Sequence, residues 1–283
     1  MTQRFRGKVV LMTGASSGIG AAAARQFAAE GAQVALVART AAALEHVAEE
    51  IRSAGGSARA FPTDVTDPAA CTRMLQAVAD AFGGIDVLVN NAGANKRGVV
   101  EQREVSELAN IIEVNLIAPI VLTRLTLPYL RKRAQAAIVN VASIAGQIAV
   151  PHEATYSASK FGLRAFTFAL REELQGTPIT VSAVSPGPVD TGFIMTELDD
   201  VPDLVFANPM STADDVARQI LDCAADGARE RTIPISTGYL ARIGSAFPAL
   251  RRMLEPMLER RGRVVKEQYR TRERAAARAG GSP

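Results

Sequence analysis

The stretch YSASK places a tyrosine and a lysine, Tyr156 and Lys160, four residues apart. On a helix this spacing brings both side chains to one face. A tyrosine hydroxyl ordinarily has a pKa of about 10, but a neighbouring ammonium group favours the phenolate and lowers that pKa. The pair could then give a proton to a developing alkoxide, or take one from an alcohol, near neutral pH. The alternative is a solvated helix face on which the two residues have no chemical role.

A second stretch, TGASSGIG at residues 13–20, contains three glycines, Gly14, Gly18 and Gly20. It follows the apolar run KVVLM and precedes a helical pattern, so it joins a strand to a helix. Such a junction presents unpaired backbone N–H groups and the positive end of the helix dipole, and glycines let the backbone approach a ligand closely. The turn therefore predicts a phosphate-binding site. The alternative is a glycine-rich turn without a ligand.

Short apolar strand patterns alternate with helical patterns along most of the chain. Continuous apolar strands of this kind predict a parallel sheet buried on both faces. Right-handed crossovers then give an α/β fold with a doubly wound, Rossmann-type sheet of about seven strands, which binds ligands at the carboxyl ends of its strands. We expect one domain over residues 1–239 and a C-terminal extension over residues 240–283. The expected strands are Lys8–Met12, Gln33–Ala38, Ala58–Phe61, Val87–Asn90, Ala137–Ala142, Thr180–Val184 and Thr232–Ile235, and the expected helices lie near 18–30, 40–54, 67–82, 104–133, 155–175 and 212–226.

Several short motifs occur in order along the chain: TGASSGIG, NNAG at 90–93, VNL at 114–116, Ser143, YSASK, and PGPVDT at 186–191. Together they resemble the short-chain dehydrogenase/reductase superfamily, of the type called classical, over roughly residues 7–238. The resemblance implies that Tyr156 and Lys160 are catalytic and that Ser143 hydrogen-bonds the substrate oxygen. It also implies that Asn115 bends its helix and supports a water that relays protons to the lysine. From the residues alone, Ser143 could be an ordinary turn serine, and Asn115 could lie on an exposed helix face.

The same resemblance indicates which residues would hold a dinucleotide cofactor. The glycine turn would meet the phosphates, and the loop after the third strand would meet the adenine. The NNAG motif would wall the cleft, and PGPVDT would shape the nicotinamide side. For Asp64 the alternative is the N-cap of the next helix. The cofactor-binding residues implied in this way are Gly14, Ser16, Ser17, Gly18, Ile19, Gly20, Arg39, Asp64, Val65, Asn91, Ala92, Gly93, Tyr156, Lys160, Pro186, Gly187, Val189 and Thr191.

The end of the second expected strand bears on the choice between NAD and NADP. NAD enzymes commonly carry an acid there, which accepts hydrogen bonds from the ribose hydroxyls and repels a 2′-phosphate, whereas this chain has Ala38. Arg39 follows it and could bind a phosphate through its planar fork of N–H donors. NADP is therefore favoured, although Ser17 stands where many NADP-preferring relatives carry a second basic residue. The alternative for Arg39 is a solvated side chain at the start of the next helix.

Composition and charge exclude several classes of protein. Hydrophobic residues make up 48% of the chain and charged residues 22%, as in ordinary globular proteins. Cys71 and Cys223 are expected in the core of a protein from a reducing compartment, and no metal site is expected. The start of the chain shows no signal-peptide pattern and no apolar run long enough to span a membrane is expected, so a cytoplasmic location is predicted.

The net charge is unevenly distributed. Residues 240–283 hold 11 Lys/Arg and 4 Asp/Glu, a net charge of +7 against +3 for the whole chain, so residues 1–239 carry −4. A mildly acidic body argues against nucleic-acid binding. In the C-terminal extension a basic amphipathic helix could pack on the protein or dock on an anionic membrane. Packing on the protein is favoured. Pro256 should kink the helix in both cases. Its apolar stripe is Phe247, Leu250, Leu254, Met257 and Leu258, interleaved with Arg251, Arg252, Arg260 and Arg261.

Residues 192–209 are expected to form a lid over the cleft, and their apolar side chains favour a hydrophobic carbonyl or alcohol substrate. The helices near 104–133 and 155–175 should pair copies of the chain into a homodimer or homotetramer, as is common in the superfamily that it resembles. The activity expected is NADP-dependent interconversion of a carbonyl compound and a secondary alcohol. The alternative is a catalytically silent, cofactor-sensing or interaction protein on the same fold. The chain retains Tyr156 and Lys160, which favours the enzyme.

Overall fold

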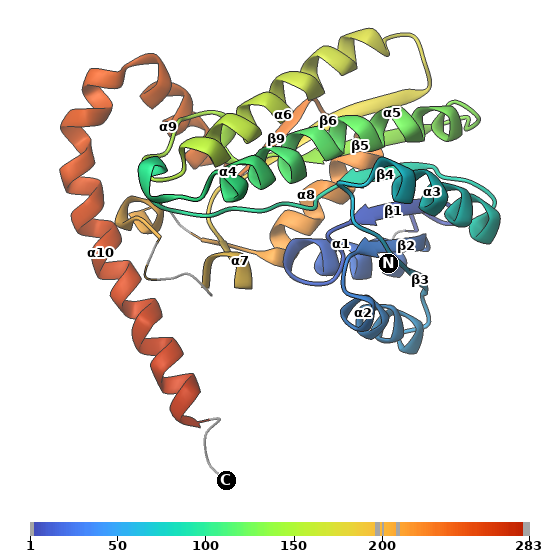
Figure 1. Ribbon diagram of the computed structural model, residues 1–283, viewed down its shortest axis with the longest axis horizontal. Coiled ribbons are helices and arrows are strands. Elements are labelled where there is room, and N and C mark those ends of the chain that lie inside the picture. The colour runs from blue at the N-terminus through green and yellow to red at the C-terminus, as the bar shows by residue number, and fades with distance from the viewer. Residues whose placement is uncertain (1–2, 196–198, 200, 208–209, 280–283) are drawn as a thin grey trace.

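In this computed structural model the chain is built around a parallel sheet of seven strands in the order β3-β2-β1-β4-β5-β6-β9 (Figure 1). The structure describes residues 3–195, 199, 201–207 and 210–279. The parallel pairing and the order of these strands confirm the expected doubly wound, Rossmann-type sheet. Its strands are β1 (Val9–Thr13), β2 (Gln33–Ala38), β3 (Ser57–Pro62), β4 (Val87–Asn90), β5 (Ala136–Val141), β6 (Ile179–Pro186) and β9 (Glu230–Ile233).

Strand β1 lies inside the sheet, next to the central strand β4, and all five of its residues are buried. It pairs in parallel with β2 on one side and with β4 on the other. The strand order therefore reverses beside β1, and such a reversal opens a crevice at the carboxyl ends of the strands. The last strand ends at Ile233, two residues earlier than expected, because Pro234 has no N–H to continue the ladder.

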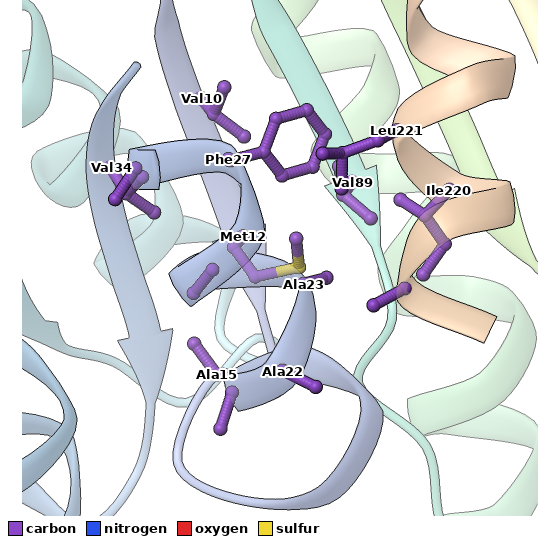
Figure 2. Close-up of a cluster of buried hydrophobic side chains, with 14 of the residues drawn as sticks. Val10, Met12, Ala15, Ala22, Ala23, Phe27, Val34, Val89, Ile220 and Leu221 are labelled. Atoms are coloured by element: carbon purple, nitrogen blue, oxygen red, sulfur yellow. The ribbon is translucent and has the colours of Figure 1, made fainter. Parts of the chain in front are cut away.

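Helices cover both faces of the sheet. One face carries α1, α2 and α8, whose side chains share a buried cluster with the strands; Figure 2 shows Phe27 of α1 at its centre, beside Val10, Val89 and Leu221. The other face carries α3, α5 and α6, which share a second cluster. Cys71 and Cys223 are both buried and free, as expected. The helices named here are α1 (Gly18–Ala29), α2 (Ala41–Ser53), α3 (Pro68–Phe82), α5 (Ala118–Leu130), α6 (Ala154–Glu173) and α8 (Ala213–Asp226).

The helix expected near 104–133 is divided in the structure. Helix α4 (Val105–Ile112) runs into a π-helical turn, Glu113–Ile117, and continues as α5. By length and composition the whole stretch Val105–Leu130 could cross a membrane. Here it covers the sheet, with Leu122 and Leu130 in the core.

The chain beyond β6 builds one side of the crevice. It contains β7 (Val189–Asp190), α7 (Gly192–Met195), a 3₁₀ helix η4 (Asp203–Ala207), β8 (Ser211–Thr212), α9 (Ile235–Ala246) and α10 (Pro248–Ala279). Of the expected lid, residues 196–198, 200 and 208–209 lie outside the described residues. Helix α10 lies along one edge of the molecule (red in Figure 1), and η4 is its main neighbour.

Only part of the apolar stripe expected in the C-terminal extension packs against the rest of the protein. Phe247 and Met257 are exposed, and the side chains of Leu250 and Leu254 lie outside the described residues. The contact with the lid is made further along α10, by Val265 and Tyr269. Pro256 lies inside the helix.

Candidate active site

A cavity of about 820 Å³ opens at the carboxyl ends of the strands. It is lined by the glycine turn after β1, by loops after β2, β3, β4 and β5, by the start of α6, and by the lid. Every residue that the sequence places in the cofactor or catalytic site lines this cavity except Asn115, which lies behind its wall. Segments as far apart in the chain as Gly14 and Leu258 are thus brought to one side of the sheet.

The glycine turn has the geometry of a cradle. Gly14 and Gly18 have positive φ angles of 64° and 53°, a conformation that other residues rarely adopt. A Cβ atom on Gly20 would lie 2.1 Å from the carbonyl oxygen of Gly14, and a Cβ on Gly14 would lie 2.8 Å from Nδ2 of Asn91. Any side chain at Gly14 or Gly20 would therefore clash with the turn.

The start of α1 is open to the cavity. Ser17 is the N-cap residue, and its side chain makes no capping hydrogen bond, so the first N–H groups of the helix remain available to a ligand. Asn91 holds the opposite wall, because its Nδ2 donates to the carbonyls of Thr13 at 2.9 Å and Gly14 at 3.2 Å. These N–H groups and the helix dipole fit a dinucleotide diphosphate.

Arg39 lines the cavity at the end of β2, and its side chain is exposed. It makes no hydrogen bond or ion pair with any residue that the structure describes, so its guanidinium can meet an anion of the ligand. Asp64 lies nearby and accepts two hydrogen bonds from Thr66, at 3.0 Å from the backbone N and 2.7 Å from Oγ1. These bonds and Arg39 hold the pKa of the Asp64 carboxyl below its usual value. Asp64 is not the helix N-cap: Asp67 caps α3 instead.

Lys160 and Tyr156 lie one helical turn apart at the start of α6, and both line the cavity. The Lys160 side chain is buried, and its Nζ donates to the carbonyl of Val141 at 2.9 Å. The same Nζ lies 5.8 Å from the centre of the Tyr156 ring. The Ser143 side chain lies close enough to Tyr156 to favour its ionised form. Ser143 also accepts a hydrogen bond from the backbone N of Ala145 at 3.1 Å, so it is a turn serine that also faces the cavity.

The pKa values of this pair differ from the sequence expectation. Burial, with a further contribution from the Glu153 carboxylate, raises the pKa of Tyr156 to about 12, and hydrogen bonding to Ser143 offsets part of this. Burial lowers the pKa of Lys160 to about 8. In the free protein, desolvation therefore outweighs the effect expected of a neighbouring ammonium group. At neutral pH the tyrosine is therefore protonated, and the lysine is mostly in its ammonium form as well.

Asn115 is fully buried, so it does not lie on an exposed helix face. It occupies the π-helical turn between α4 and α5. Its Oδ1 accepts from the backbone N of Ala94 at 2.8 Å, and its Nδ2 donates to the carbonyl of Ala94 at 2.8 Å and to Oγ of Ser159 at 3.1 Å. The side chain thus ties the π-helical turn to the loop after β4 and to the helix that carries Lys160.

The sequence reasoning missed an ion pair in the cavity wall. Nε of Arg97 lies 2.6 Å from Oε1 of Glu153, and the side chains are 4% and 7% exposed. Arg97 also donates to the carbonyl of Phe193 at 3.3 Å and lies over its ring. Glu153 precedes Tyr156 by three residues, a spacing that could have indicated it, but nothing in the sequence indicates its partner. His152, next to it, is exposed and does not line the cavity.

Thr237 is another residue that no sequence motif indicated. It lies on α9, lines the cavity and is 4% exposed. Its hydroxyl has no hydrogen-bond partner among the described residues. No cluster of three or more His, Cys, Asp or Glu in the described part of the chain could hold a metal ion.

Comparisons with known proteins agree with this geometry. The family model described as short chain dehydrogenase matches residues 8–201. The ketoacyl reductase HetN of a Nostoc species is 40% identical over 216 residues, which cover 76% of this chain and 75% of that protein. The chain belongs to the short-chain dehydrogenase family, and its activity class is NAD(P)-dependent oxidoreduction.

Solved structures show the same fold. A crystal structure of an actinorhodin polyketide ketoreductase variant with NADPH has a TM-score of 0.77 and 32% identity, covering 84% of this chain and 98% of that one. A short chain dehydrogenase from Burkholderia cenocepacia, in complex with NADP, has a TM-score of 0.74 and 32% identity, covering 81% of this chain and 97% of that one. The whole of α10 lies outside the family match, which ends at residue 201.

Proposed function

We propose that the protein is an NADP-dependent reductase that interconverts a ketone and a secondary alcohol. One observation carries the proposal: Tyr156, next to the buried Lys160, lines the same cavity as Ser143 and an open glycine turn. Relatives named as a ketoacyl reductase and a polyketide ketoreductase support a carbonyl substrate.

Bound NADPH would supply the hydride for the carbonyl carbon. The hydroxyls of Ser143 and Tyr156 hold the carbonyl oxygen, and Tyr156 gives it a proton as negative charge develops there. The raised pKa of Tyr156 suits reduction of the carbonyl, because the hydroxyl carries the proton to be given at neutral pH. The Lys160 side chain, fixed by Val141, then stabilises the phenolate that remains. Asn115 positions the loop after β4, through its two hydrogen bonds with Ala94.

The preference for NADP rests on the residues at the end of β2. Arg39 is an exposed cation on the cavity wall, and Ala38 before it offers no carboxylate to repel a phosphate. Two similar structures hold NADPH or NADP. Arg39 would bind the 2′-phosphate by charge-assisted hydrogen bonds.

The test is to follow absorbance of the reduced nicotinamide while the protein is offered a panel of ketones with NADPH and with NADH. We expect turnover with NADPH, and Tyr156→Phe should lower kcat by about 10²- to 10⁴-fold while leaving the Kd for NADPH within about twofold. A variant that retains more than about a tenth of the wild-type rate would contradict the proton-transfer role. No NADPH oxidation with any ketone would contradict the function.

Self-association is proposed through the outer face of α6. Ala158, Phe161 and Ala165 are exposed, so they are not part of the chain's own core. Ile117, in the neighbouring π-helical turn, is also exposed. A second copy could cover these apolar side chains. Light scattering at micromolar concentration should give a dimer or tetramer, and a monomer would contradict this proposal. The cytoplasmic location and the membrane contact of the C-terminal extension stay predictions.

A further inference from the structure

Helix α10 and the lid are held together by a small apolar cluster. Phe206 of η4 is 1% exposed, and its ring centre lies 6.0 Å from that of Tyr269 on α10. Val265 of α10 and Ile194 and Val201 of the lid belong to the same cluster. At Gly262 the helix comes so close that an added Cβ would lie 1.8 Å from the carbonyl oxygen of Asp203. Glycine is therefore needed there for the helix backbone to reach the lid backbone.

Basic side chains of α10 strengthen this contact. Lys266 is 5% exposed, and its Nζ donates to the carbonyl oxygens of Asp199 at 3.0 Å and Val201 at 2.6 Å. It also lies 3.7 Å from Oδ1 of Asp203. A buried ammonium group is stable only when its donors are paired, and here most of its partners are backbone groups of the lid. Lys266 therefore fixes the path of the lid backbone and also pairs with the negative charge of Asp203.

Two further ion pairs flank Lys266 on the same side of the helix. Nε of Arg263 lies 3.1 Å from Oδ2 of Asp203, and Nη2 of Arg270 lies 2.6 Å from Oδ1 of Asp199. Arg263 is largely exposed, so its pair contributes little. Part of the positive charge of the C-terminal extension thus meets the acidic lid of the same chain.

The other side of this assembly faces the active site. Leu204 and Val205 of η4 line the cavity, and so do Met257 and Leu258 of α10. Helix α9 adds two small residues to the same wall, Ala241 and Gly244. This wall is continuous with the part of the cavity that holds Ser143 and Tyr156, and the side chains named here offer no hydrogen-bonding group. An apolar surface of this kind fits a saturated carbon chain.

We propose that α10 is part of the substrate site: it fixes the lid and, through Met257 and Leu258, forms the outer wall of a channel for the alkyl chain of the substrate. The proposal rests on the proposed function in that the reacting carbonyl lies at Ser143 and Tyr156. The substrate class that follows is a ketone with a linear alkyl chain. The C-terminal extension therefore sets chain-length specificity.

The first test uses calorimetric titration of the NADP-loaded protein with linear methyl ketones from butanone to decanone. Affinity should rise by up to about fourfold for each added methylene that contacts the wall. Met257→Ala should weaken decanone binding about fourfold or more and change butanone binding by less than about twofold. The matched control is Met253→Ala, which removes an exposed methionine one turn earlier that does not line the cavity.

The outcomes separate this inference from the proposed function. Equal effects of the two methionine variants, affinity independent of chain length, or no binding of decanone would each overturn the inference. Butanone reduction by NADPH in the same preparations tests the function independently. If butanone is reduced while decanone binds no better, the function stands and the inference fails. If no ketone is reduced but binding follows chain length and Met257, the inference stands and the function fails.

The second test concerns the hold of α10 on the lid. Lys266→Met should raise amide hydrogen exchange across residues 201–207 by about tenfold or more, because the carbonyls of Asp199 and Val201 lose the donor that holds this part of the lid. Arg263→Met is the control, and it should change exchange there by less than about twofold. Exchange in β1 should be unchanged in both variants, which excludes general unfolding. Equal exchange in the two variants would overturn the role assigned to Lys266.

Discussion

Replacing Arg97 by leucine would leave the Glu153 carboxylate without its ion-pair partner beside Tyr156. The two side chains are 2.6 Å apart and almost fully buried. Removing one member of such a pair leaves an uncompensated charge away from water, which typically costs about 3–5 kcal/mol. Arg97→Leu should therefore be among the most destabilising single substitutions in the cavity wall.

The expected shift in melting temperature follows from the size of the protein. An unfolding entropy of about 2.1 cal/mol/K per residue gives about 0.6 kcal/mol/K for 283 residues. A loss of about 3–5 kcal/mol then lowers Tm by about 5–8 °C. The double variant with leucine at both positions should lose less than Arg97→Leu alone, because no buried charge remains.

The assay is thermal unfolding of the cofactor-free protein followed by circular dichroism. Arg25→Leu is the control, because Arg25 and Glu50 also lie 2.6 Å apart but are both largely exposed; it should shift Tm by less than about 2 °C. If Arg97→Leu shifts Tm no more than this control, the argument from burial is refuted. A double variant that loses the sum of the two single losses would refute the coupling.

Three further predictions concern the cavity. Arg39→Ala should weaken NADP binding by about 1–3 kcal/mol and leave NAD binding nearly unchanged in calorimetric titrations; equal losses would mean that Arg39 does not contact the 2′-phosphate. The pKa of Lys160 falls from 10.5 to about 8 on folding, so the unfolded chain binds more protons above pH 8, and stability of the cofactor-free protein should rise with pH between about 8 and 9, below the range in which the raised pKa values of the buried thiols of Cys71 and Cys223 oppose it. The opposite sign applies to Tyr156, whose pKa rises from 10.0 to about 12 on folding, so stability should fall as pH rises between those values; Lys160→Met should abolish the first trend in thermal unfolding and keep the second. Thr237→Val removes a buried hydroxyl without a partner and should raise the free energy of unfolding by about 1 kcal/mol in denaturant titrations; a lower stability would show that the hydroxyl is paired.

Most element boundaries could be predicted because their signals are local. The helix expected near 67–82 is observed as Pro68–Phe82, capped by Asp67 and ended by Gly83 with a φ of 79°. The helix expected near 212–226 begins with a capping box of Thr212 and Asp215. Caps and glycine stops act within a few residues, so the sequence alone determines where such helices lie.

The positions of the site residues could also be predicted. In a parallel sheet the carboxyl ends of all strands lie at one edge, so motifs that follow β1, β4, β5 and β6 must meet once the strands pair. Gly14, Asn91, Ser143 and Gly187 accordingly line one cavity. For Asn115 the prediction of a site residue came only from the family resemblance, because the partners of its side chain, Ala94 and Ser159, lie far from it in the sequence.

The electrostatics of the cavity were decided by the tertiary structure. Arg97 and Glu153 are 56 residues apart, and their pairing depends on how the loop after β4 packs against the start of α6. The direction of the Tyr156 pKa shift was wrong in the sequence expectation, since the spacing to Lys160 shows a neighbour but not the burial of both groups. Desolvation depends on everything that excludes water from a site, and no local pattern contains it.

For the C-terminal extension, too, the sequence determined some properties and the tertiary structure decided others. Its sequence determined a basic, amphipathic helix with a net charge of +7 over residues 240–283, because charge and helical periodicity are properties of the chain itself. The surface of the lid decided which side chains of α10 are covered. The lid is acidic and apolar in the places that meet Lys266, Val265 and Tyr269. A helix with several apolar and basic positions can be buried along more than one line, and only the packing of the folded chain selects one of them.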